Sequence, residues 1–127
     1  MVEAISPALQ EFLTERHLAV LVTQRPDGSP HAVPVGFTFH DGVVRVITRA
    51  GSAKVRHARA GGRASVTQVD GGRWVTLEGH AAVIDDPAGV AAAVAAYAAR
   101  YRQPAERDDR VAITITVDRM LMPRSLK

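Results

Sequence analysis

The sequence predicts a mainly β protein with flanking helices, in which about six antiparallel strands form a closed or half-closed barrel. Short apolar runs rich in β-branched residues recur along the chain, and tight-turn dipeptides separate them. Only three segments have helical patterns. Because most strands are apolar on both faces, an open sheet would expose an apolar edge strand that is prone to aggregation. We therefore expect the sheet to close on itself and to complete its burial in a dimer.

The composition predicts a single soluble domain over residues 1–127, with 46% hydrophobic and 23% charged residues. The absence of cysteine excludes a disulfide scaffold and a thiol nucleophile. The sequence shows no secretory leader and no apolar run of membrane-spanning length, so we expect a cytoplasmic protein that binds no membrane. The net charge of +3 comes without a basic tail or a nucleic-acid motif, so nucleic-acid binding is not expected.

The first part of the chain is expected to form a helix and then a meander. The helix covers residues 6–16, with Ser6 as its cap and Pro7 at its first position. Strands are expected over about residues 18–24, 31–39 and 43–48. Asp41-Gly42 favours a two-residue hairpin between the last two of them. Pro30 and Pro34 place the second strand at a sheet edge or a bulge, because proline cannot donate to the ladder.

The remaining segments alternate strands with two more helices. A short helix runs from Ser52 to about Ala60, and an alanine-rich helix begins at Pro87 after Asp85 or Asp86 as its cap. Further strands are expected over residues 63–69, 73–84 and 110–122. The apolar pattern assigns to the core or to an interface Phe37, Phe39, Val43, Val46, Val66, Val75, Leu77, Val83, Ile113 and Ile115.

Cationic residues surround the turn that begins the short helix. Thr48 ends a strand, Ser52 occupies the cap position, and Arg49 and Lys54 flank it. Helix N–H groups, hydroxyls and cationic side chains would converge there on a small anion such as phosphate. The alternative is a solvent-facing basic helix with an ordinary serine cap. The GxxxxGK[ST] spacing of a P-loop is absent from this stretch.

A second informative stretch is QVDGGRWVTLEG, residues 68–79, which contains the only tryptophan. Trp74 follows a tight turn beside Arg73, so its ring could fill the core, contact a second subunit or lie beside a flat aromatic ligand. Gln68 could offer its amide to the hydrogen-bonding edge of such a ligand.

Other chemistries receive no support from the sequence. The five histidines are scattered, without HExxH or other paired spacing, so no metal site is expected. No GxSxG elbow surrounds Ser52, which argues against a hydrolase. No acid–base pair of carboxylates is evident, and no catalytic residue is assigned.

The order of these segments resembles the split-barrel superfamily of pyridoxamine-phosphate-oxidase-like proteins over about residues 6–120. The resemblance is carried by HLAVLVTQRPDGSPHAVPVGFTF, VRVIT followed by GSAKVRHAR, ASVTQVDGGRWVTLEGHAAV and YAARYRQP. Through FLTERHLAVLVT, VGFTF, QVDGGRWVTLEG and RYRQP, the chain is similar to an actinobacterial branch that binds the deazaflavin coenzyme F420 in place of FMN. Within that branch it resembles the F420-dependent biliverdin reductases. The resemblance implies a split β-barrel that forms a homodimer.

The resemblance also implies a cofactor site. The segment Thr48–Lys54 would grip the cofactor phosphate, while residues around Val33–Gly36 and Gln68–Trp74 would contact a ring held at the dimer interface. The charges of Arg56 and Arg59 would suit the polyglutamate tail of F420. The residues assigned to cofactor binding are Val33, Pro34, Val35, Gly36, Thr48, Arg49, Ser52, Lys54, Val55, Gln68, Val69, Arg73 and Trp74.

The implied activity is an oxidoreductase that transfers a hydride from reduced F420 to a conjugated small-molecule acceptor, with biliverdin as the candidate. No side chain is an evident donor for the accompanying proton. Two alternatives stay open. One is an FMN-binding reductase or oxidase of the same fold, although the last strand carries few basic residues beyond Arg110 and Arg119. The other is a non-catalytic protein that binds F420, haem or a bilin.

Overall fold

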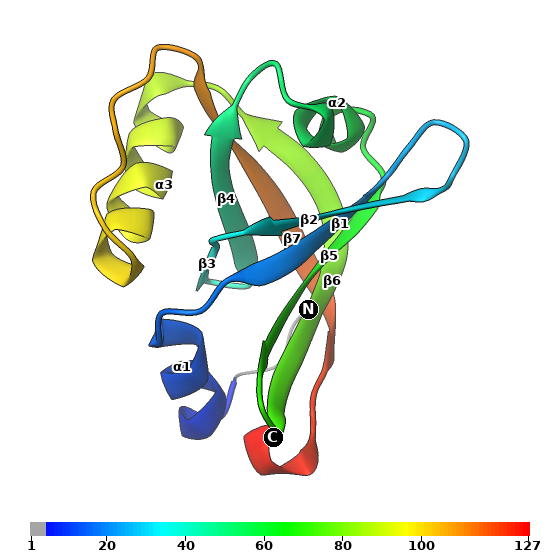
Figure 1. The fold of residues 1–127 in the computed structure, drawn as a ribbon, viewed down its shortest axis with the longest axis vertical. Helices are drawn as coiled ribbons and strands as arrows, with labels where there is room; N and C mark the ends of the chain where they lie inside the picture. Colours follow the sequence, from blue (N-terminus) through cyan, green and yellow to red (C-terminus); the bar gives the residue numbers. More distant parts are fainter. Residues whose placement is uncertain (1–4) are drawn as a thin grey trace.

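The structure is a computed structural model that describes residues 5–127 as a seven-stranded antiparallel sheet with three α-helices (Figure 1). The helices are α1 (Pro7–Thr14), α2 (Ala53–Arg59) and α3 (Pro87–Arg100), and a short 3₁₀ turn, η1 (Arg124–Leu126), follows the sheet. The strands are β1 (Ala19–Gln24), β2 (Pro30–Val35), β3 (Thr38–His40), β4 (Val43–Arg49), β5 (Arg63–Asp70), β6 (Arg73–Ile84) and β7 (Arg110–Leu121). The mainly β fold class with flanking helices is confirmed.

The seventh strand arises because the segment predicted as one strand over residues 31–39 is interrupted. The β2 ladder with β1 ends where Val35 pairs with Ala19, and the β3 ladder with β4 begins where Thr38 pairs with Arg45. Gly36 and Phe37 lie between and belong to neither ladder. The prediction of a continuous strand is wrong, because an alternating pattern does not reveal which neighbour each residue pairs with.

The strand order is β2-β1-β5-β6-β7-β4-β3, so two strands that follow each other in the chain occupy opposite edges of one sheet. The chain crosses from edge to edge at Gly36 and Phe37, which curls the sheet into a barrel that is split at this point. The edge position predicted from Pro34 is confirmed. Between β6 and β7 the register shifts after Glu78. A Cβ on Gly79 would lie 1.8 Å from the Thr116 carbonyl oxygen, so only glycine fits this bulge.

Local turn and cap chemistry agrees with the sequence. Asp41 and Gly42 have φ values of 52° and 76°, the left-handed pair that a tight hairpin turn requires. The Ser6 hydroxyl accepts from the Leu9 N–H at 3.0 Å and donates to the Leu126 carbonyl at 2.7 Å. Asp86 accepts from the Gly89 N–H at 2.8 Å and caps α3.

The core fills the inner side of the sheet, and α1 covers one end of it. Leu9, Phe12 and Leu13 of α1 are buried there. α2 packs on β1 and β6, and α3 packs on β3, β4 and β7 (Figure 1). Seven of the predicted core residues are buried: Phe37, Val46, Val66, Val75, Leu77, Ile113 and Ile115. Phe39 and Val83 pack against them half-buried, and Val43 is half-buried. Within residues 5–127 no helix combines the length and apolar character that crossing a membrane requires.

Candidate functional site

A buried hydroxyl without a hydrogen-bond partner lies at the turn between β4 and α2. Ser52 has the backbone geometry of the cap of α2, yet its side chain makes no capping bond. Its Oγ is buried and has no partner among the described residues. A cap serine ordinarily accepts from an N–H of the first turn. Because an unpaired buried hydroxyl costs about 1–3 kcal/mol, this one fits a site whose acceptor is a bound anion.

Cationic side chains accompany this hydroxyl. Burial lowers the pKa of Lys54, and the positive charge of Arg49 lowers it further, so the two cations lie within electrostatic reach of each other. Neither side chain makes an ion pair within residues 5–127. The Arg49 charge also lowers the pKa of Asp109, so one carboxylate lies within its electrostatic reach. Arg49 and Lys54 flank Ser52 in the chain, and two such cations with a hydroxyl that lacks a partner are groups that bind phosphate.

The other residues predicted around this turn have different surroundings. Thr48 is half-buried near the end of β4, where it pairs with Val111. Val55 is fully buried in the core, so it anchors α2 rather than facing solvent. Arg56 donates to the Gly51 carbonyl at 3.2 Å, and Arg59 lies 3.6 Å from the Asp85 carboxylate. Both arginines are exposed.

In β2, strand alternation separates the predicted ring-contact residues. Val33 and Val35 pair with the buried residues Leu21 and Ala19, so they face the inner side of the sheet. Pro34 is exposed on the outer side. A Cβ on Gly36 would lie 3.0 Å from the Tyr97 ring and 3.2 Å from the Tyr101 ring. Glycine at this position therefore allows the end of α3 to pack directly on the backbone.

Gln68 differs from its expected role. Its side chain is fully buried, its Nε2 donates to the Phe12 carbonyl at 3.0 Å, and its Oε1 accepts from the Arg100 guanidinium. Both ends of the amide are thus engaged inside the protein and are not presented to a ligand. The inward side-chain alternation of β5, with Val66 two residues earlier, is the pattern that could have indicated this burial.

Arg73 joins the β5–β6 hairpin to the end of α1. It donates to the two carboxylate oxygens of Glu15 at 2.8 and 2.9 Å and to Asp70 at 2.6 Å. The Arg73 hydrogen bonds, followed by one from His17, lower the pKa of Glu15 to about 2. The oxygens and nitrogens of Glu15, His17 and Asp70 lie within 4.8 Å of one another. Since Arg73 already supplies the positive charge among them, the cluster is not a candidate metal site.

The outer face of the sheet carries a patch of exposed apolar side chains. The strand registers place one row of residues across this face: Pro34, Val20, Thr67, Thr76 and Leu121. Val69 and Trp74 form the next outward-facing pair along β5 and β6. Trp74 is 36% exposed and Val69 is 60% exposed, so the tryptophan does not fill the core. We call Val20, Pro34, Val69, Trp74 and Leu121 the outer patch.

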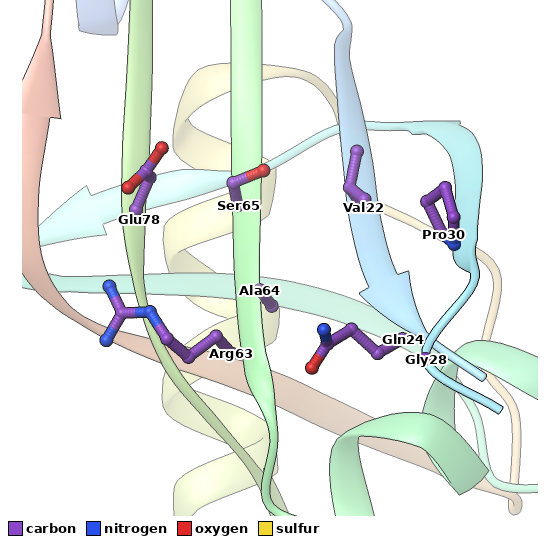
Figure 2. Close-up of a pocket in the computed structure, with 8 residues that line it drawn as sticks. All are labelled: Val22, Gln24, Gly28, Pro30, Arg63, Ala64, Ser65 and Glu78. Carbon is purple, nitrogen blue, oxygen red and sulfur yellow. The ribbon is translucent and has the colours of Figure 1, made fainter. Parts of the chain in front are cut away.

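A shallow groove of about 280 Å³ continues the same face (Figure 2). Figure 2 shows Arg63, Ser65 and Glu78 on β5 and β6, across from the residues of β1 and the β1–β2 turn. Its lining residues are Val22, Gln24, Gly28, Pro30, Arg63, Ala64, Ser65 and Glu78. Arg63 is held by the Asp118 carboxylate at 2.7 and 2.8 Å. None of the cofactor-binding residues predicted from the sequence lines this groove.

The chain has a close sequence relative of named activity. Residues 5–122 match the family model described as pyridoxamine 5′-phosphate oxidase. Over 112 residues the chain is 50% identical to a protein of Mycobacterium tuberculosis (strain CDC 1551 / Oshkosh) named F420H2-dependent biliverdin reductase. That alignment covers 87% of this chain and 82% of the relative.

Solved structures agree with the fold. The conserved hypothetical protein Rv2991 of Mycobacterium tuberculosis superposes with a TM-score of 0.78 at 26% identity, over 92% of this chain and 83% of that one. A structure described as an F420 reductase superposes with a TM-score of 0.73 at 23% identity, over 88% of this chain and 94% of that one; this second likeness is one of fold. On the family match and the 50% identity, the chain belongs to the pyridoxamine 5′-phosphate oxidase family of split β-barrels.

Proposed function

We propose that this protein is a reductase that uses reduced coenzyme F420 and transfers a hydride to a conjugated acceptor, with biliverdin as the candidate. The observation that carries this proposal is the 50% identity, over 87% of the chain, to a reductase named for that coenzyme and that substrate. The turn at the start of α2 supports it independently, because its unpaired hydroxyl and the two cations that flank it in the chain match the phosphate group of the coenzyme.

Different residues of this chain are proposed to bind different parts of the coenzyme. The Ser52 hydroxyl would hold the coenzyme phosphate, and Lys54 and Arg49 would neutralise its charge. Arg56 and Arg59 lie in the last turn of α2, where their charges would suit the carboxylates of the tail. When bound, the coenzyme supplies the hydride. The protein's own contribution is to orient the coenzyme and acceptor and to exclude water from between them.

The outer patch is proposed to be the interface of a homodimer, with the coenzyme ring held at its border. Three of the residues predicted to contact the ring, Pro34, Val69 and Trp74, belong to this patch. Exposed apolar side chains gathered on one sheet face are typical of an interaction surface. A second copy would cover them and provide the wall that one chain lacks on this side. A bilin is a conjugated molecule that carries two propionates, and arginine side chains are suited to binding such carboxylates.

The proposal is tested by titrating the purified protein with F420 and, in parallel, with FMN, following the fluorescence of Trp74. We expect F420 to bind at micromolar concentration and FMN to bind much more weakly. Reduced F420 should then be reoxidised when biliverdin is added, with the return of the deazaflavin absorbance as the readout. A preference for FMN would place the protein among the flavin enzymes instead. Binding of F420 without turnover of any acceptor would indicate a carrier or storage protein.

A further inference from the structure

The end of α3 fills the gap at which the barrel is split. The Phe37 N–H donates to the Tyr101 hydroxyl oxygen at 3.2 Å, and the Phe37 carbonyl accepts from Nη1 of Arg100 at 2.6 Å. The Tyr101 hydroxyl donates in turn to the His17 carbonyl at 2.6 Å. Phe37 belongs to neither strand ladder, so these two side chains provide the hydrogen bonds that a neighbouring strand provides elsewhere.

Arg100 also connects segments that lie far apart in the sequence. Its Nε donates to the Glu15 carbonyl at 2.9 Å, and its Nη2 donates to Oε1 of Gln68. The guanidinium lies 4.7 Å from the centre of the Phe37 ring and 5.0 Å from that of Tyr101. All three hydrogen-bond acceptors of Arg100 are neutral oxygens, and it makes no ion pair within residues 5–127.

Half-burying a cation whose hydrogen-bond acceptors are all neutral costs desolvation free energy that no ion pair offsets. Burial lowers the pKa of Arg100, and the electrostatic effects of Tyr101 and Glu15 act in the opposite direction. An apolar side chain would pack there without that cost. What the guanidinium provides instead is a rigid planar fork, with donors aimed at three different segments.

We propose that Arg100 and Tyr101 are positioning residues for the coenzyme ring, because they fix the Val33–Gly36 segment relative to the β5–β6 hairpin. This inference rests on the proposed function. Phe37, which both residues hold, directly follows Val33–Gly36. In the β5–β6 hairpin, Arg100 donates to the side chain of Gln68. Arg100 also donates to the backbone carbonyl of Glu15, and the Glu15 carboxylate accepts from Arg73. The two predicted ring-contact segments therefore share one anchor, although neither Arg100 nor Tyr101 is assigned a contact with the coenzyme.

The inference is tested with Tyr101→Phe and Arg100→Lys, with Arg102→Lys as the matched control. Tyr101→Phe keeps the ring that packs on Gly36 and removes only the hydroxyl. Arg100→Lys keeps the charge but cannot serve three acceptors in a fixed plane. Arg102 is exposed and makes no hydrogen bond or ion pair within the described part of the chain.

Two measurements are made on each variant. Amide hydrogen exchange of the protein without coenzyme reports the anchoring, and the Kd for F420 reports the site. In Tyr101→Phe we expect exchange at Phe37 to accelerate roughly tenfold while core amides such as Val66 and Ile113 keep their rates. We expect the Kd for F420 to rise roughly tenfold in Tyr101→Phe and in Arg100→Lys, although the second variant keeps the positive charge. Arg102→Lys should have the Kd of the wild type.

The possible failures are distinguishable. If the wild type does not bind F420, the proposed function is overturned. If the wild type binds and both variants bind with the same Kd, the positioning role alone is overturned, whatever happens to thermal stability. The same conclusion follows if exchange in Tyr101→Phe accelerates equally throughout the sheet, because the two residues would then hold the fold as a whole and not this segment.

Discussion

Ser52→Ala should have opposite effects on stability and on coenzyme binding. In the free protein the Ser52 hydroxyl is buried without a partner and makes no capping bond. Alanine therefore removes the desolvation cost of the hydroxyl and loses no hydrogen bond. An unsatisfied buried hydroxyl costs about 1–3 kcal/mol. Taking the lower end, the free energy of unfolding should rise by about 1 kcal/mol, which corresponds to a Tm roughly 3–5 °C higher for a domain of this size.

Binding should respond in the other direction. A hydrogen bond to a charged acceptor contributes about 1.5–3 kcal/mol, so losing the one to phosphate should raise the Kd for F420 by roughly 10- to 150-fold. Tm is measured by calorimetry of the free protein, and Kd by fluorescence titration. Ser6→Ala is the control, because Ser6 makes both of its cap contacts and lies in α1. It should lose about 0.5–2 kcal/mol of stability and keep its Kd. If Ser52→Ala behaves like Ser6→Ala, Ser52 is an ordinary cap and the anion site is refuted.

Further predictions concern the cation Lys54, the stability of the fold at acid pH, the proposed dimer interface, and Gly36 at the split in the barrel. Lys54→Ala should weaken F420 binding at least about tenfold in titration, whereas Arg59→Ala should weaken it less. Because folding lowers the pKa of Glu15 from 4.5 to about 2, the ionised carboxylate stabilises the fold fully above pH 4.5. This contribution is lost as the pH falls from 4.5 toward 2. In Glu15→Gln, the Tm measured by calorimetry should therefore depend less on pH between 4.5 and 2. Leu121→Glu should shift the protein from dimer to monomer in sedimentation velocity, and an unchanged dimer would place the interface elsewhere. Gly36→Ala should lower Tm and F420 affinity together, because its methyl group presses on Tyr97 and Tyr101.

The elements that could be predicted from the sequence are those that depend on neighbouring residues. Ser6 and Asp86 accept from N–H groups three residues away, and Asp41-Gly42 forms its turn within the hairpin. The interruption at Phe37 could not be predicted in this way. The groups that satisfy its backbone belong to residues 63 and 64 positions later, and no local pattern encodes that pairing.

The candidate site shows the same limit. The sequence placed Ser52 correctly at the start of α2, but an unpaired hydroxyl is a property of the packed structure. As a polar residue in a strand near the tryptophan, Gln68 has the sequence pattern of a ligand contact. Its actual partners are a carbonyl 56 positions earlier and a guanidinium 32 positions later. A buried polar residue with distant partners cannot be distinguished from a ligand contact by sequence pattern alone.

The strand order has a consequence for how the protein is made. β7 is the one strand that joins β6 to β4, so without it the remaining strands form two separate ladders, β2-β1-β5-β6 and β4-β3. Because β7 follows the other six described strands in the chain, a nascent chain cannot complete this sheet until residues 110–121 have left the ribosome. Until then the apolar edges of β6 and β4 stay unpaired, and pairings between such distant segments form slowly. Unpaired strand edges of this kind make a folding chain prone to aggregation, so the pairing of β7 with both edges also removes that hazard.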